Sequence, residues 1–121
     1  MARMEISRVY TFEAAHSLPK LPPTHKCHRL HGHSFRVVVH IAGPVDEALG
    51  WVEDYWVVDT AFKPLHDILD HSHLNEIDGL DNPTSENIAR WIWVRLQKTL
   101  PGLSCVMVQE TPDTGCAYRG D

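Results

Sequence analysis

The sequence has no long apolar run, and no stretch approaches the ~20 residues that a membrane-spanning helix needs. It also has no excess of positive charge: 11 Lys and Arg stand against 16 Asp and Glu, and the formal net charge is -5. A general nucleic-acid-binding protein would be basic, so this class is disfavoured. Its three cysteines are too few, and odd in number, for a disulfide framework.

The N-terminal residues lack the apolar core of a secretory signal peptide, so we expect the protein in the cytoplasm. The composition is ordinary for a globular protein, with 43% hydrophobic residues. A chain of 121 residues is long enough for one hydrophobic core but not for two. We therefore expect one domain over residues 1–121.

Histidine is the residue type that stands out, with nine in the chain. Five fall within a short stretch, namely His16, His25, His28, His31 and His33. His31 and His33 begin a β-branched run, and alternate residues of a strand project from the same face. Both imidazoles can therefore reach one ion.

A third imidazole, His16, stands near the end of an earlier strand-like run. Three histidine ligands with an open fourth position are typical of a catalytic zinc site rather than a closed structural one. The simpler alternative is that His31 and His33 lie on the solvated face of a strand and that His16 is unrelated.

Hydrophobic periodicity and turn residues predict an α+β domain in the order ββααββ, with two helices on one face of an antiparallel four-stranded sheet. Pro64 falls inside the first helix and predicts a kink or break there. Thr84 and Ser85 are typical of a helix start. The six elements span about residues 5–15, 31–41, 55–69, 85–100, 103–110 and 116–119.

Five motifs occur in order along the chain: Thr11–His16, Cys27–His33, Leu69–His71, Pro83–Asn87 and Glu110–Thr111. Together they resemble the 6-pyruvoyl-tetrahydropterin synthase superfamily over essentially the whole chain. The resemblance is closest to the bacterial branch, the 6-carboxy-5,6,7,8-tetrahydropterin synthases of queuosine biosynthesis. It implies the tunnelling (T) fold, whose sheets close into a β-barrel when subunits assemble as trimers or dimers of trimers.

The resemblance implies that Zn²⁺ is the cofactor, bound by His16, His31 and His33, and that Cys27 is the catalytic base. A thiol acts as a base only as its thiolate, which nearby positive charge stabilises. Lys26 and Arg29 flank Cys27 in the sequence. The alternative is an ordinary cysteine in a solvated basic loop.

By the same resemblance, Asp70 and His71 form a proton relay with the cysteine. The resemblance also implies that Glu110 accepts two hydrogen bonds from a pterin ring and is both a catalytic and a substrate-binding residue. Thr84 and Ser85 cap a helix and line the pterin pocket from another subunit. Without the resemblance, Asp70 and His71 suit a solvated helix end, and Glu110 suits a solvent-facing strand end.

The function implied is a zinc-dependent carbon–carbon lyase that converts 7,8-dihydroneopterin triphosphate to 6-carboxytetrahydropterin, acetaldehyde and triphosphate. Cys27 and His71 would come from one subunit and Glu110 from the next. Three alternatives remain open. They are a 6-pyruvoyl-tetrahydropterin synthase-type lyase, a non-catalytic zinc-stabilised binding protein and a metal-dependent hydrolase.

Overall fold

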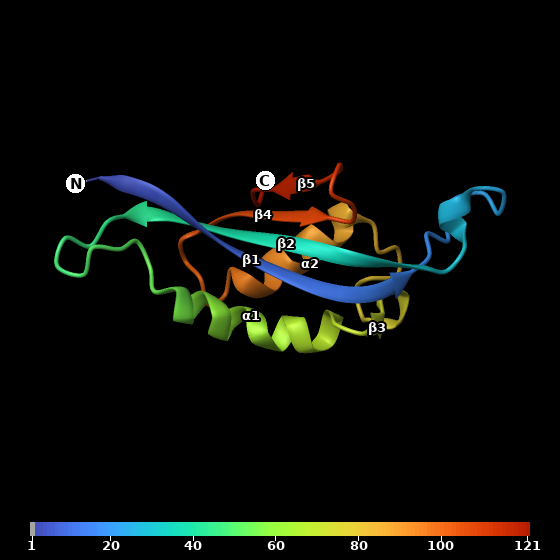
Figure 1. Ribbon diagram of the computed structural model, residues 1–121, viewed down its shortest axis with the longest axis horizontal. Helices are drawn as coiled ribbons and strands as arrows, with labels where there is room; N and C mark the ends of the chain where they lie inside the picture. The colour runs from blue at the N-terminus through green and yellow to red at the C-terminus, as the bar shows by residue number, and fades with distance from the viewer. Residues whose placement is uncertain (1) are drawn as a thin grey trace.

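The computed structural model describes residues 2–121, and two long antiparallel strands run along the molecule (Figure 1). Strand β1 (Arg3–His16) pairs with strand β2 (His31–Pro44) without a break in register. The pairing begins at Arg3 opposite Pro44 and ends at His16 opposite His31. This register brings two histidines that are far apart in sequence to one end of the sheet.

The sheet has five strands in the order β3-β1-β2-β4-β5. Strand β4 (Leu103–Gln109) pairs antiparallel with β2, and strand β5 (Cys116–Tyr118) pairs antiparallel with β4, as expected. Strand β3 (Ser72–His73) is a correction, because it pairs parallel to β1 and makes the sheet mixed rather than purely antiparallel. A strand of two residues is too short to show an alternation of apolar and polar side chains, so the sequence could not predict β3. Its pairing depends on where the preceding helix ends.

Helices α1 (Tyr55–Leu69) and α2 (Ser85–Leu96) cover one face of the sheet (Figure 1). Each begins with a side-chain cap: Asp54 accepts from the Trp56 N–H, and Thr84 accepts from the Asn87 N–H. The core lies between these helices and the sheet and includes Phe12, Phe35, Val37, Phe62, Leu69, Ile88 and Ile92. Neither helix of the described residues is long and apolar enough to cross a membrane.

The break predicted at Pro64 is wrong, because α1 is continuous from Tyr55 to Leu69. Proline removes one hydrogen bond to the carbonyl four residues earlier, here that of Thr60. Both Thr60 and Pro64 are exposed, so water can satisfy this carbonyl. The flanking Phe62 and Leu65 are buried in the core, which holds both halves of the helix against the sheet.

Candidate active site

His16, His31 and His33 meet at the end of the β1–β2 ribbon. Their potential ligand nitrogens all lie within 4.8 Å of one another. The imidazole of His16 is fully buried, whereas His31 and His33 are partly open to solvent. A group with one buried and two accessible ligands is suited to hold a metal ion that also contacts a substrate.

Backbone carbonyls fix the orientation of two of these rings. The His16 Nδ1–H donates to the carbonyl of Pro83 at 2.8 Å, and the His31 Nδ1–H donates to that of Arg29 at 2.6 Å. A carbonyl can only accept, so each Nδ1 carries the proton and each Nε2 presents a lone pair. Histidines that ligate a metal usually donate their other ring N–H to a carbonyl or a carboxylate in this way.

The Nε2 atom of His16 is buried and has no hydrogen-bond partner in the described chain. Burial lowers the pKa of His16, which keeps the ring neutral and able to ligate. A buried polar atom without a partner is costly unless something binds it. The three histidines therefore fit a metal ion, and among metals the nitrogen donors suit zinc.

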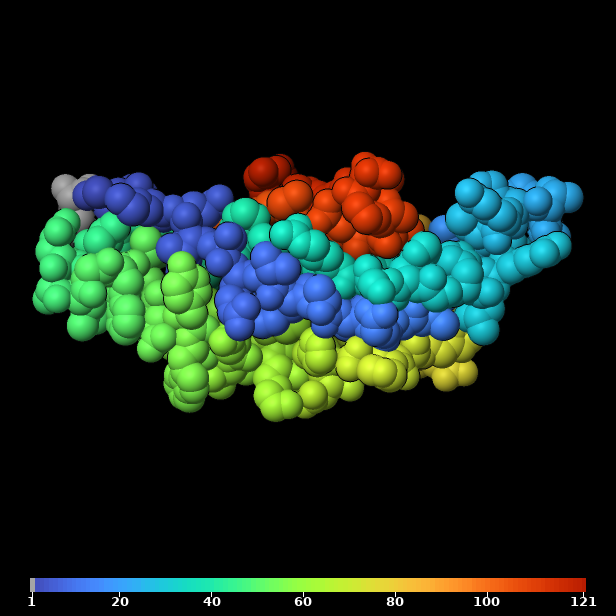
Figure 2. All heavy atoms as spheres, viewed as in Figure 1, coloured from blue at the N-terminus to red at the C-terminus, as the bar shows by residue number. Residues whose placement is uncertain are grey.

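A cavity of about 460 Å³ opens beside the histidines. One wall is the 3-10 segment η1 (Lys26–His28), and the opposite wall is the loop between β4 and β5. Figure 2 shows the hollow between these two projections. Its lining residues are Lys26, Cys27, His31, His33, Glu110, Thr111 and Thr114.

Local hydrogen bonds hold Cys27 in this wall. The Cys27 N–H donates to the His25 Nδ1 at 3.0 Å, and the Cys27 carbonyl accepts from the Leu18 N–H at 2.9 Å. The thiol is partly exposed and lines the same cavity as His31 and His33. A free thiol held beside a potential metal site can react with a substrate that is bound to the metal.

Glu110 lines the same cavity as Cys27, and its Oε2 lies 3.9 Å from the His33 Nε2. One chain therefore supplies both the thiol and the carboxylate. The expected division of Cys27 and Glu110 between subunits is wrong. The sequence could not show this, because the loop of residues 17–30 and the end of β4 meet only once the sheet has formed.

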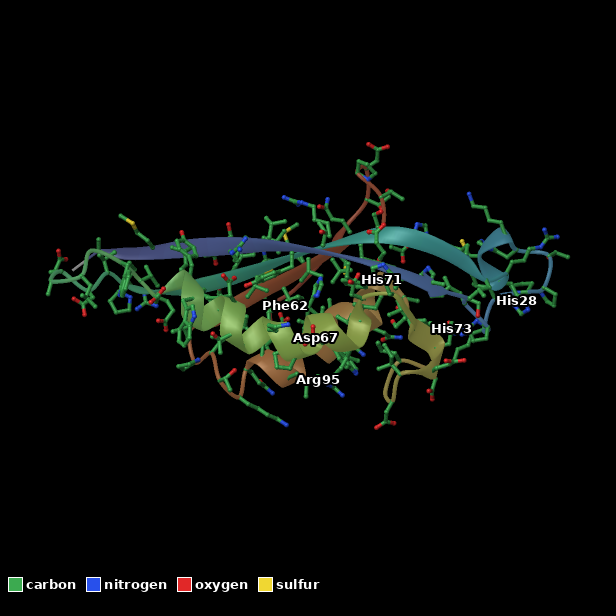
Figure 3. The ribbon with its side chains drawn as sticks, turned by 60° about the horizontal axis from the view of Figure 1, so that its bottom comes forward. His28, Phe62, Asp67, His71, His73 and Arg95 are labelled. Atoms are coloured by element: carbon green, nitrogen blue, oxygen red, sulfur yellow. The ribbon has the colours of Figure 1, made fainter. Side chains whose placement is uncertain are left out.

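Asp70 and His71 lie just after α1, and their side chains are hydrogen-bonded, with 2.9 Å between Asp70 Oδ2 and His71 Nδ1. His71 has a left-handed backbone (φ 58°), and its side chain is 79% exposed. It lines a second cavity, of about 490 Å³, which shares only His33 with the first. In Figure 3, His71 lies at the end of α1, away from His28 on the projecting loop. The structure thus does not bring His71 into the Cys27 cavity of its own chain.

The Glu13 N–H donates to Asp70 Oδ1 at 2.9 Å. This hydrogen bond, followed by that with His71, lowers the pKa of Asp70. A lowered folded-state pKa stabilises the fold above the unfolded value of about 3.9, and the stabilisation is lost as the pH falls further.

We expect Asp70→Asn to melt at a lower temperature than the wild type at neutral pH, because a neutral amide oxygen accepts from the Glu13 N–H and from His71 more weakly than a carboxylate does. The difference should shrink below about pH 4, where the wild-type carboxylate becomes protonated. Thermal unfolding followed by circular dichroism across this pH range tests the expectation. A difference in melting temperature that does not change with pH would contradict it.

The predicted substrate-binding residues Thr84 and Ser85 lie at the start of α2 and line neither of the two cavities. Their roles toward a substrate remain predictions. Sequence reasoning missed the role of Pro83, whose carbonyl orients His16. No sequence signal identifies a carbonyl that becomes a hydrogen-bond acceptor only after folding.

The motifs, the strand register and the histidine cluster agree with the comparison to known families. A family model described as "6-pyruvoyl tetrahydropterin synthase" matches residues 5–121. The chain belongs to this family. A solved family structure, the 6-pyruvoyl tetrahydropterin synthase of Caenorhabditis elegans, superposes with a TM-score of 0.92 at 28% identity and covers 100% of this chain and 98% of that one.

Two curated relatives carry other names within the family. The 6-carboxy-5,6,7,8-tetrahydropterin synthase of Synechocystis sp. is 42% identical over 119 residues, which cover 93% of this chain and 91% of the relative. The dihydroneopterin monophosphate aldolase of Pyrococcus furiosus is 38% identical over 92 residues, which cover 76% of this chain and 74% of the relative. Family membership alone therefore leaves the exact reaction to be argued from the site.

Proposed function

We propose that the protein is a zinc-dependent 6-carboxy-5,6,7,8-tetrahydropterin synthase. It would convert 7,8-dihydroneopterin triphosphate and water to 6-carboxytetrahydropterin, acetaldehyde and triphosphate. The observation that carries the proposal is the cavity in which a thiol and a carboxylate flank the three histidines. The 42% identity to a relative of that name supports the choice of reaction.

Each residue of the cavity has a role that its chemistry allows. Glu110 accepts hydrogen bonds from the amino edge of the pterin ring and fixes the ring in the cavity. Cys27, as a thiolate, takes a proton from the side-chain carbon next to the ring. His16, His31 and His33 would hold zinc, which when bound supplies Lewis acidity to the side-chain oxygens.

We further propose that the partner's His71 completes the site in a trimer or dimer of trimers. His71 is exposed, lines a different cavity from Cys27 and is held by Asp70, so it is free to serve a neighbouring chain. The edge of β1 also lacks a strand partner over residues 3–13 of the described chain. An open edge of this length is a ready template for pairing with another subunit.

Subunit mixing tests this arrangement. Inactive Cys27→Ala and His71→Ala chains, dissociated and reassembled together, should regain about a quarter of wild-type activity, the fraction of interfaces at which random assembly joins two intact residues. Mixing Cys27→Ala with Glu110→Ala chains is the matched control and should restore nothing, because these residues share one cavity. If the mixture of Cys27→Ala and His71→Ala chains regains no activity, Cys27 and His71 act within one chain and the proposed arrangement is wrong.

Product identification tests the reaction itself. Zinc-loaded protein incubated with dihydroneopterin triphosphate should release 6-carboxytetrahydropterin and acetaldehyde in equal amounts. Formation of 6-pyruvoyltetrahydropterin without acetaldehyde would instead assign the pyruvoyl-forming reaction. Since the Pyrococcus relative is named a monophosphate aldolase, the monophosphate should be assayed alongside.

A further inference from the structure

The cavity beside the histidines carries opposite charges on its two walls. Lys26 lies on the η1 wall and Glu110 lies on the β4–β5 wall, and His31 and His33 line the same cavity. Within residues 2–121, neither Lys26 nor its neighbour Arg29 is within ion-pair distance of a carboxylate. The η1 wall thus offers unpaired positive charge to a ligand.

The backbone beneath these cations is fixed. The Cys27 N–H donates to His25, the Arg29 N–H donates to the Lys26 carbonyl at 3.3 Å, and the His28 Nδ1–H donates to the Leu21 carbonyl at 3.0 Å. A cation on a fixed backbone loses less entropy on binding than one on a mobile loop. The backbone from which the Lys26 side chain reaches is therefore held in place relative to the histidines.

We propose that Lys26 binds the phosphoester end of the substrate and, with Glu110 at the other end, sets the direction in which the substrate lies. This inference rests on the proposed function. A phosphorylated dihydropterin has hydrogen-bond donors at its ring edge, oxygens in the middle of its side chain and negative charge at its end. With the ring edge on Glu110 and the side-chain oxygens at the histidines, the charged end is left to face the wall that carries Lys26.

Arg36 is another cation near Glu110, but it lies on the side of the site where the pterin ring would bind. Arg36 lines a separate cavity of about 340 Å³ together with Glu110 and Thr111. Its guanidinium is also held by Gln109, with 2.7 Å between Arg36 Nη1 and Gln109 Oε1. A phosphate at Arg36 would lie on the Glu110 side, where the ring is anchored, and so Lys26 is the better candidate.

Lys26 is also next to Cys27, so a test must separate phosphate binding from an effect on the thiol. We therefore place each substitution in a zinc-loaded Cys27→Ala background, which cannot carry out the proton abstraction and has no thiol to influence. Lys26→Gln is compared with Lys20→Gln, a matched loss of charge at a lysine outside the cavity. The two ligands are 7,8-dihydroneopterin triphosphate and unphosphorylated 7,8-dihydroneopterin.

In fluorescence titrations at one salt concentration, Lys26→Gln should raise the dissociation constant of the triphosphate about 10- to 100-fold, the effect of losing one hydrogen bond to a charged group. Its dissociation constant for unphosphorylated dihydroneopterin, and both constants of Lys20→Gln, should stay within about twofold, because no phosphate contact is lost. Equal weakening of both ligands by Lys26→Gln, or no weakening of either, would overturn the inference. If neither pterin binds any of these proteins, the proposed function itself is wrong.

Discussion

Cys27→Ala should keep its zinc and its fold but lose ~10²–10⁴-fold in kcat, the usual contribution of a positioned general base. The expectation follows from the place of the thiol, which lines the cavity with His31 and His33 but is not one of the three clustered ligands. Steady-state turnover of dihydroneopterin triphosphate and zinc analysis of the same sample measure the two effects.

Cys116→Ala is the matched control, because Cys116 is also a partly buried free thiol but lies in β5, outside both cavities of the site. Its turnover should stay close to that of the wild type. Near-normal turnover of Cys27→Ala would reject the thiol as the base. Loss of zinc from Cys27→Ala would instead indicate that the thiol is a zinc ligand.

His31→Ala should lower zinc affinity at least ~100-fold, because the loss of an outer-shell partner alone costs ~10–100-fold. Turnover should disappear with the metal, and a chelator should abolish the wild-type activity in the same way. His31 is the suitable position, since it is only partly buried and its removal spares the core better than that of His16.

His73→Ala controls for the loss of an imidazole outside the cluster, since His73 is partly exposed and its Nδ1 contacts Glu76 rather than the three histidines. Mass spectrometry of bound metal should find full zinc in this variant and little in His31→Ala. Full activity in wild-type protein shown to be free of metal would contradict the role of the ion.

The long elements could be predicted because their signals are local. The start of α2 could be predicted from the Thr84 hydroxyl, which accepts a hydrogen bond from the Asn87 N–H three residues later. Strands β1 and β2 could be predicted from their alternating β-branched residues. The short strand β3 and the unbroken helix through Pro64 were not predictable, because each depends on packing against the sheet. Local pattern carries no information on such tertiary support.

The site divides in the same way. His31 and His33 could be paired from their spacing, because alternation on one strand is a local property. Two other features of the site depend on segments more than 60 residues apart. Glu110 and Cys27 share one cavity, and the Pro83 carbonyl orients His16 across a separation of 67 residues. Their arrangement follows from how the loops and the start of α2 pack around the end of the sheet, which the sequence pattern alone does not specify.

A crystal structure of the zinc-loaded Cys27→Ala protein with dihydroneopterin triphosphate, with anomalous data at the zinc edge, tests the central claim most directly. The account predicts one zinc peak at His16, His31 and His33, with the pterin amino edge on Glu110 and the side-chain oxygens at the metal. A zinc peak elsewhere, or a pterin bound outside the cavity between η1 and the β4–β5 loop, would contradict it.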